Sequence, residues 1–201
     1  MIDKGFKGVW LIVKLNLLFV LFTLCGLVVF GIGAALQMTS DLFQESELDY
    51  RKVTFQKAWL SFKTNFLRSN GLFWLYNGVA LLLGYNLYLS VQLTGIVWII
   101  INFILIAATL FIFIAYQYVL VYTTNYDIPV SQLIKLSFIS IFLSFGSFLK
   151  LIFGFVVIMI ISWLMKGLFL FATVSLMIAW DNIATKQNRD FVDKRLTVDE
   201  E

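Results

Sequence analysis

The side chains that most often carry out catalysis are missing from the apolar parts of this sequence. The chain has no histidine, which removes the commonest general base and metal ligand and excludes serine–histidine hydrolysis. Its single cysteine, Cys25, cannot form an internal disulfide or a thiolate metal cluster. The long apolar stretches contain no Asp or Glu, so they hold no carboxylate pair for acid–base chemistry. We therefore expect no catalytic, cofactor-binding or metal-binding residues, and a protein that is not an enzyme.

A few polar residues do fall inside the apolar stretches and form a candidate intramembrane polar site. Lys166 interrupts the apolar run 151–179, where it could contact an anion or a carbonyl inside a helix bundle. Alternatively, the helix is displaced or broken there and the ammonium reaches the lipid head groups. Asn77, Asn102 and Gln117 are uncharged polar residues that either bond between helices or line a pore.

A second pattern predicts a helix that lies in the plane of the membrane surface. Phe55, Trp59, Phe62 and Phe66 recur at spacings of four, three and four, so they share one helical face. Basic and hydroxyl residues repeat the same spacing on the opposite face, among them Lys57 and Arg68. This arrangement is typical of an interfacial helix over about 53–69, although the aromatic face could instead pack against the membrane spans.

The composition of the chain requires a membrane around these residues. Of its 201 residues, 61% are hydrophobic and only 13% are charged, whereas soluble domains contain about a quarter charged residues. A span needs about 20 mostly apolar residues. The sequence predicts one all-α membrane domain over 1–201, with about five spans at 15–36, 71–91, 95–122, 130–149 and 151–179. The second and third spans should form an antiparallel hairpin, and 151–179 is read as one long helix, with a break at Lys166–Gly167 as the alternative.

The polar segments complete this arrangement. Residues 39–50 are acidic and are expected to form a solvated loop, and the tail 181–201 is expected to face solvent. Five spans with the amino terminus outside place 51–68 and the tail on the cytoplasmic side, where basic residues accumulate. A six-segment arrangement would instead return both termini to the cytoplasm.

Four serines in the second half of the chain share a helical face. Ser137, Ser140, Ser144 and Ser147 are spaced by three, four and three residues. Small residues on one face let helices approach closely, so this pattern favours a packing seam over a polar substrate path.

Several stretches resemble the YesL-like bacterial membrane proteins, a family built on a domain of unknown function. The similarity is closest at Asn16–Phe19 and along 21–34, and continues through Phe55, Trp59 and Phe62–Phe66 to the polar turn Asn125–Pro129. Many family members carry Leu-Pro late in the first span, where this chain has Leu24-Cys25-Gly26. The family has no assigned catalytic residues. The resemblance implies a role beside carbohydrate uptake systems in Gram-positive-type bacteria.

These observations lead to one functional expectation and one alternative. We expect a non-enzymatic multi-pass protein of the cell membrane, acting as an accessory or regulatory component of carbohydrate uptake with a permease as partner. The alternative is a small oligomeric transporter or channel that acts on its own. The lipid bilayer is the expected environment, nucleic acid is not an expected partner, and the oligomeric state stays open.

Overall fold

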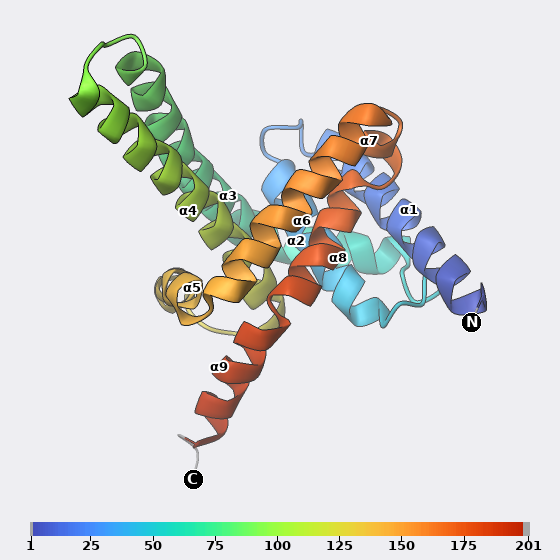
Figure 1. The fold of residues 1–201 in the computed structure, drawn as a ribbon. Coiled ribbons are helices and arrows are strands. Elements are labelled where there is room, and N and C mark those ends of the chain that lie inside the picture. Colours follow the sequence, from blue (N-terminus) through green and yellow to red (C-terminus); the bar gives the residue numbers. More distant parts are fainter. Residues whose placement is uncertain (1, 199–201) are drawn as a thin grey trace.

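The computed structural model describes residues 2–198, and the side chains of 5–194, as an arrangement of helices joined by short turns (Figure 1). No strand occurs in this part of the chain, which confirms the predicted all-α class. The helices are α1 (Ile2–Cys25), α2 (Ile32–Ser46), α3 (Phe55–Ser90), α4 (Ile96–Asn125), α5 (Val130–Leu143), α6 (Phe145–Leu164), α7 (Leu168–Phe171), α8 (Thr173–Ala184) and α9 (Lys186–Val198).

Within residues 2–198, four segments are long and apolar enough to cross a membrane: Gly5–Cys25, Phe55–Ser90, Ile96–Asn125 and Phe145–Leu164. The chain is therefore a multi-pass membrane protein. The sequence predicted about five spans, and the difference arises at turns inside the apolar stretches, which divide some of them into shorter helices.

The first of these turns falls inside the predicted span 15–36, so the prediction of one helix there is wrong. Helix α1 ends at Cys25, the chain reverses over 26–31, and α2 returns beside α1. A Cβ on Gly31 would lie 2.6 Å from the Thr23 carbonyl oxygen and 2.9 Å from the Gly26 Cα, so the reversal needs a glycine there. Leu27 and Val28 adopt positive φ angles of 56° and 62° in the same turn.

Helix α3 joins two elements that were predicted to be separate. The expected interfacial helix over 53–69 continues without a break into the expected span 71–91, giving 36 residues and a length of about 54 Å. Thr54 caps its first turn by accepting a hydrogen bond from the Lys57 amide. Ser69 and Asn70 before Gly71 are residue types that often cap helices, but the Asn70 side chain bonds to Phe30, Ala34 and Phe66 instead, and no proline removes a backbone donor, so the helix continues.

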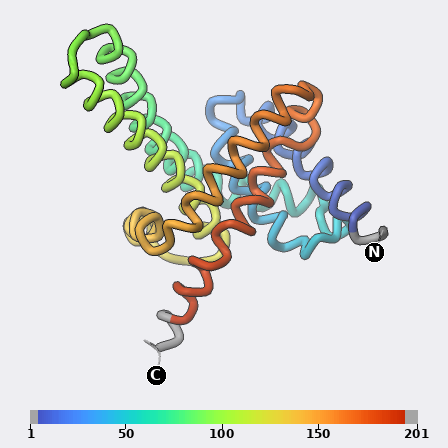
Figure 2. The backbone as a smooth tube through the Cα atoms, in the orientation of Figure 1, coloured from blue at the N-terminus to red at the C-terminus, as the bar shows by residue number. Residues whose placement is uncertain are grey.

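The predicted hairpin of the second and third spans is present. Helices α3 and α4 lie side by side and are joined by a turn at Val91–Gly95, with Gly95 at a φ of 124°. The outer half of this hairpin projects away from the other helices, as Figures 1 and 2 both show.

The remaining predicted spans are also divided. A break at Ser144 separates α5 from α6, because the Ser144 hydroxyl accepts from the Ser147 amide and starts a new helix. The predicted single helix over 151–179 is wrong: α6 ends at Leu164, and the chain turns at Lys166–Gly167 before α7 and α8. Figure 1 looks along the axis of α5, which therefore runs crosswise to α6.

The serine pattern spans this break, and two of its members form the predicted packing seam. The Ser137 hydroxyl bonds to the Tyr76 hydroxyl at 3.0 Å, and the Ser140 hydroxyl bonds to the Tyr122 hydroxyl at 2.6 Å. Both pairs link α5 to the α3/α4 hairpin.

The two ends of the bundle differ in polarity. Lys14 on α1 donates to the Tyr50 carbonyl, Arg68 on α3 donates to the Ile128 carbonyl, and Tyr126 donates to Asp193 on α9. These contacts put the amino-terminal half of α1, the loop before α3 and the tail at one end. The sequence predicted that the amino terminus and residues 51–68 lie on opposite sides of the membrane. That arrangement is wrong, because α2 runs back beside α1 and α8 runs back beside α6.

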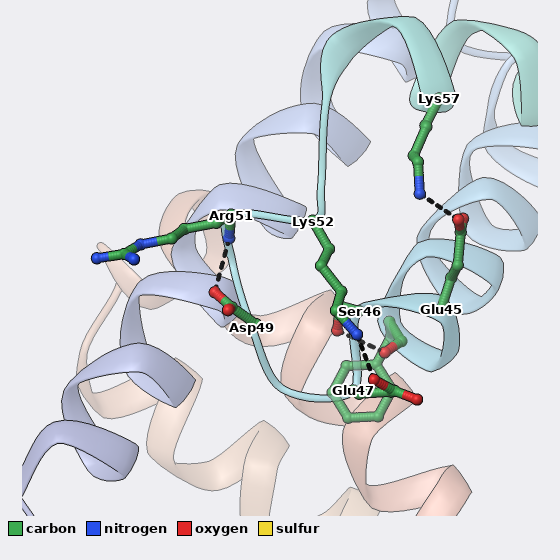
Figure 3. Close-up of polar contacts among 8 residues, drawn as sticks. Glu45, Ser46, Glu47, Asp49, Arg51, Lys52 and Lys57 are labelled. Atoms are coloured by element: carbon green, nitrogen blue, oxygen red, sulfur yellow. Dashed lines mark hydrogen bonds and ion pairs between the residues drawn. The ribbon is translucent and has the colours of Figure 1, made fainter.

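The acidic and basic halves of the segment 39–69 meet at this polar end (Figure 3). Glu45 lies in the last turn of α2 and pairs with Lys57, while Glu47 pairs with Lys52 in the loop. The Asp49 carboxylate accepts from the Arg51 amide at 3.0 Å. The predicted solvated loop is thus limited to residues 47–54, since the preceding acidic residues belong to α2.

Candidate functional site

A groove lies between the α3/α4 hairpin on one side and helices α6 and α8 on the other. Its volume is about 630 Å³, within the range of about 300–1,000 Å³ of small-molecule sites. The walls are mainly apolar, with Phe73 and Ala80 from α3, Phe113 from α4, and Met159 from α6. Such a groove suits an apolar body, and the few polar groups in its wall decide what else is recognised.

Asp181 is the charged residue in this wall, and it is almost entirely buried, with 1% of its surface exposed. Neither of its carboxylate oxygens has a hydrogen-bond partner among the described residues. A buried carboxyl group without a partner is costly and calls for a donor or a cation. The sequence placed Asp181 at the start of a solvent-facing tail. That expectation is wrong because α8 extends to Ala184 and packs against α4 and α6.

Gln117 and Asn77 add unused hydrogen-bonding capacity to the same wall. Gln117 on α4 is 8% exposed, and its amide makes no hydrogen bond within the described part of the chain. Asn77 on α3 donates to the Phe73 carbonyl of its own helix at 2.9 Å. Tyr116, also in the wall, lies within electrostatic reach of Asp181.

Only two of the four predicted intramembrane polar residues reach this groove. Asn77 and Gln117 line it, whereas Asn102 lies near the tip of the hairpin and bonds to Ser90. Lys166 is exposed in the turn between α6 and α7. Its position in a broken helix matches the alternative in which the ammonium is not enclosed by the bundle.

The residues predicted for the interfacial helix make mostly internal contacts. Phe62 is 6% exposed, and its ring centroid lies 5.1 Å from that of Phe22 on α1; Phe55 and Trp59 also contact Phe22 but remain about half exposed. Phe66 packs on Phe62. Three of the four aromatic rings thus contact α1, as in the alternative interpretation, while the exposed parts of Phe55 and Trp59 leave the interfacial helix a prediction.

The opposite face of this segment makes polar contacts within the protein. Lys57 pairs with Glu45 on α2. Arg68 donates to the Ile128 carbonyl at 2.6 Å, with Asp127 at 3.9 Å from its guanidinium.

Two polar residues that sequence analysis did not assign to a site, one buried and one half-buried, hold the bundle together. Asn16 on α1 is fully buried and bonds to four backbone groups at the break between α7 and α8. Its amide donates to the Phe169 and Leu170 carbonyls at 3.1 and 2.7 Å. Its oxygen accepts from the Val174 and Ser175 amides at 2.9 and 3.2 Å. These contacts replace helical bonds lost at Ala172.

Asp41 on α2 is the second of these residues. Its carboxylate accepts from Gln37 and Thr124 at 2.8 Å, from Ser61 at 2.7 Å and from Asn65 at 3.0 Å. These donors come from α2, α3 and α4, so Asp41 ties three helices together. One feature of the sequence could have indicated this role: Asp41 stands several residues before the loop 47–54, within the residues that form α2.

Among the described residues, no group of three potential metal ligands is present. The described lining of the groove holds one carboxyl group, that of Asp181, together with the hydroxyls of Tyr76, Thr109 and Tyr116 and the amides of Asn77 and Gln117. The fold and groove define a multi-pass helical membrane protein with one buried acid in an apolar cleft.

Residues 12–87 match the family described as "Protein of unknown function, DUF624". The matched segment runs from the second half of α1 to the last turn of α3 and contains both Asn16 and Asp41. The match confirms the resemblance to the YesL-like proteins for this segment. No curated protein and no solved structure matches the chain. Helices α6 and α8, which carry Asp181 and one wall of the groove, lie outside the matched segment.

Proposed function

We propose that this protein is a non-enzymatic component of the cell membrane that assists or regulates a partner permease for carbohydrate uptake. The single observation that carries the proposal is the outer half of the α3/α4 hairpin. Its large apolar side chains are mostly exposed, and they include Leu81, Leu82, Tyr88, Ile99 and Phe103. A long hairpin that packs mainly on itself presents two helices to whatever lies beside it in the membrane.

A protein partner is favoured over lipid alone by the polar groups on this hairpin. Asn86 is exposed between apolar neighbours, and its side chain bonds only to the Leu82 carbonyl of its own helix within the described structure. An exposed amide at lipid depth is stabilised when a neighbouring helix supplies a hydrogen-bond partner. The family resemblance implies a role beside carbohydrate uptake systems, so the proposed partner protein is a carbohydrate permease.

The experiment is site-specific photocrosslinking in cells. A photoreactive phenylalanine analogue at Phe103 or Leu82 should crosslink to a membrane protein that mass spectrometry identifies as a carbohydrate permease subunit. The matched control is Ile183 on α8, which is 67% exposed, close to the 65% of Leu82. Crosslinks at both hairpin positions to lipid alone, or equal protein crosslinks at Ile183, would contradict the proposal.

A second candidate is a transporter or channel that acts on its own, and the buried Asp181 favours it. Ion-coupled transporters commonly carry an acid inside the membrane, and the groove has one. Purified protein in liposomes should then support uptake of a labelled oligosaccharide, and Asp181→Asn should abolish it. The absence of flux with the wild-type protein would favour the accessory role.

A further inference from the structure

The groove between the α3/α4 hairpin and α6/α8 has one feature that the accessory role leaves unused, namely the unpartnered Asp181. The wall around it is mainly apolar, and its other polar side chains come from α3 and α4: Tyr76, Asn77, Thr109, Tyr116 and Gln117. Helix α8, which carries Asp181, packs against α4. An occupant would therefore meet apolar side chains along most of its length and one carboxyl group, that of Asp181.

The charge of the wall indicates the charge of the occupant. Among the described residues that line the groove, Asp181 is the one carboxylic acid, and none is lysine or arginine. No described side chain donates a hydrogen bond to either carboxylate oxygen. A ligand with a cationic donor would complete the site, and an anionic ligand would meet an acid with nothing to offset it.

We propose that this groove binds a membrane-soluble amphiphile whose apolar body carries a protonated amine and no phosphate, with the ammonium at Asp181. The groove is partly open and not an enclosed cavity, which leaves a path for such a molecule to enter it. A primary ammonium donates to Asp181, and the unused amide of Gln117 offers a second acceptor. The phosphate of an aminophospholipid would have no basic partner in the described wall.

Probes that differ only at their head group test this proposal. The full-length protein is placed in nanodiscs of phosphatidylcholine and exposed to a sixteen-carbon chain with a central diazirine. The chain ends in an amine, a hydroxyl or a carboxylate. We expect saturable labelling of groove peptides from α4, α6 and α8 by the amine. Half-saturation should lie about tenfold below that of the alcohol, which is the size of one charge-assisted hydrogen bond.

Two variants of the protein distinguish binding of the probe at Asp181 from non-specific partitioning of the probe into the bilayer. Asp181→Asn should reduce labelling by the amine to the level of the alcohol. Asp190→Asn, which removes an exposed acid on α9, should leave it unchanged. The proposal is overturned if the three probes label the groove equally, or if Asp181→Asn labels as the wild type does.

Repeating the assay in a second lipid shows whether the ammonium group that binds belongs to a phosphate-free amphiphile or to an aminophospholipid. Nanodiscs of phosphatidylethanolamine should give the same labelling by the amine probe as those of phosphatidylcholine. Loss of labelling only in phosphatidylethanolamine would show that an aminophospholipid occupies the groove, which contradicts the phosphate-free ligand. The binding assay uses the purified protein alone, so its outcome is independent of the crosslinks expected for a partner permease.

Discussion

Four polar side chains from two regions of this molecule are bonded in opposite ways. In the packed region, formed by α1, α2, the first half of α3 and the break between α7 and α8, Asn16 and Asp41 each make four hydrogen bonds. In the hairpin–groove region, formed by the α3/α4 hairpin with α6 and the end of α8, Asp181 and Gln117 have no hydrogen-bond partner among the described residues.

The difference separates polar residues that stabilise the fold from those that are available for binding. A buried polar group without a partner costs free energy, so a chain that keeps one at a groove gives up stability there. The predictions for Asn16, Gly33 and Asp41 each compare a residue of the packed region with a matched residue elsewhere.

The largest effect is expected at Asn16. Replacing Asn16 with Leu leaves two carbonyls and two amides at the α7–α8 break without partners and should lower the free energy of unfolding by about 4 kcal/mol. The matched substitution Asn86→Leu removes only a bond to the Leu82 carbonyl of the same helix and should change it by less than about 0.5 kcal/mol. Thermal unfolding in detergent measures both, and equal losses would mean that the two regions do not differ.

A smaller effect is expected at Gly33, where α2 approaches α3 closely. A Cβ there would lie 2.8 Å from the Ser69 carbonyl oxygen and 2.7 Å from the Phe73 Cβ. Gly33→Ala should therefore force the helices apart and destabilise the protein by about 1–3 kcal/mol. Gly78 on the hairpin has no described atom within 4 Å of such a Cβ, so Gly78→Ala should stabilise the protein by about 0.5–1 kcal/mol. A loss of stability in Gly78→Ala would show that this part of the hairpin is packed against another surface.

The smallest effect is expected in the loop 47–54. The hydrogen bond from Lys52, together with its positive charge, lowers the pKa of the exposed Glu47 from its ordinary value of 4.5. A lowered folded-state pKa stabilises the protein above the unfolded-state pKa, and this contribution is lost as the pH falls through the folded-state value. Glu47→Gln should leave stability near neutral pH within error and remove a slight loss below about pH 4.5. Differential scanning fluorimetry across pH and salt concentration tests this, and a large loss at neutral pH would be inconsistent with a surface pair.

The parts of the fold that could be predicted from the sequence are those fixed by local signals. The hairpin at 91–95 follows from two long uncharged runs separated by Gln92-Leu93-Thr94-Gly95, and the helix ends beside this turn, Ser90 and Ile96, lie within one residue of the predicted ones. The start of α5 after Pro129 was also predictable, because proline disfavours helix in the residue before it.

The breaks inside apolar runs could not be predicted, because distant residues stabilise them. The interruption at Ala172 depends on Asn16, more than 150 residues earlier in the chain. The reversal at 26–31 is apolar on both sides, so neither composition nor hydropathy marks it. The groove was missed for the same reason. Asp181 follows the apolar run in sequence, and only the packing of α8 places it inside the bundle.

The stabilities of two leucine variants, Asp41→Leu and Asp181→Leu, test the central contrast most directly. Asp41→Leu leaves the Ser61 hydroxyl and the Asn65 amide on α3 without an acceptor, and it removes the carboxylate that joins α2 to α3 and α4. It should therefore lower the free energy of unfolding by about 3 kcal/mol. Asp181→Leu removes a buried carboxyl group without a partner and adds apolar surface to an apolar wall, so its unfolding temperature should equal or exceed that of the wild type. A loss at Asp181 as large as that at Asp41 would show that Asp181 stabilises the fold, and would contradict the distinction between the packed region and the hairpin–groove region.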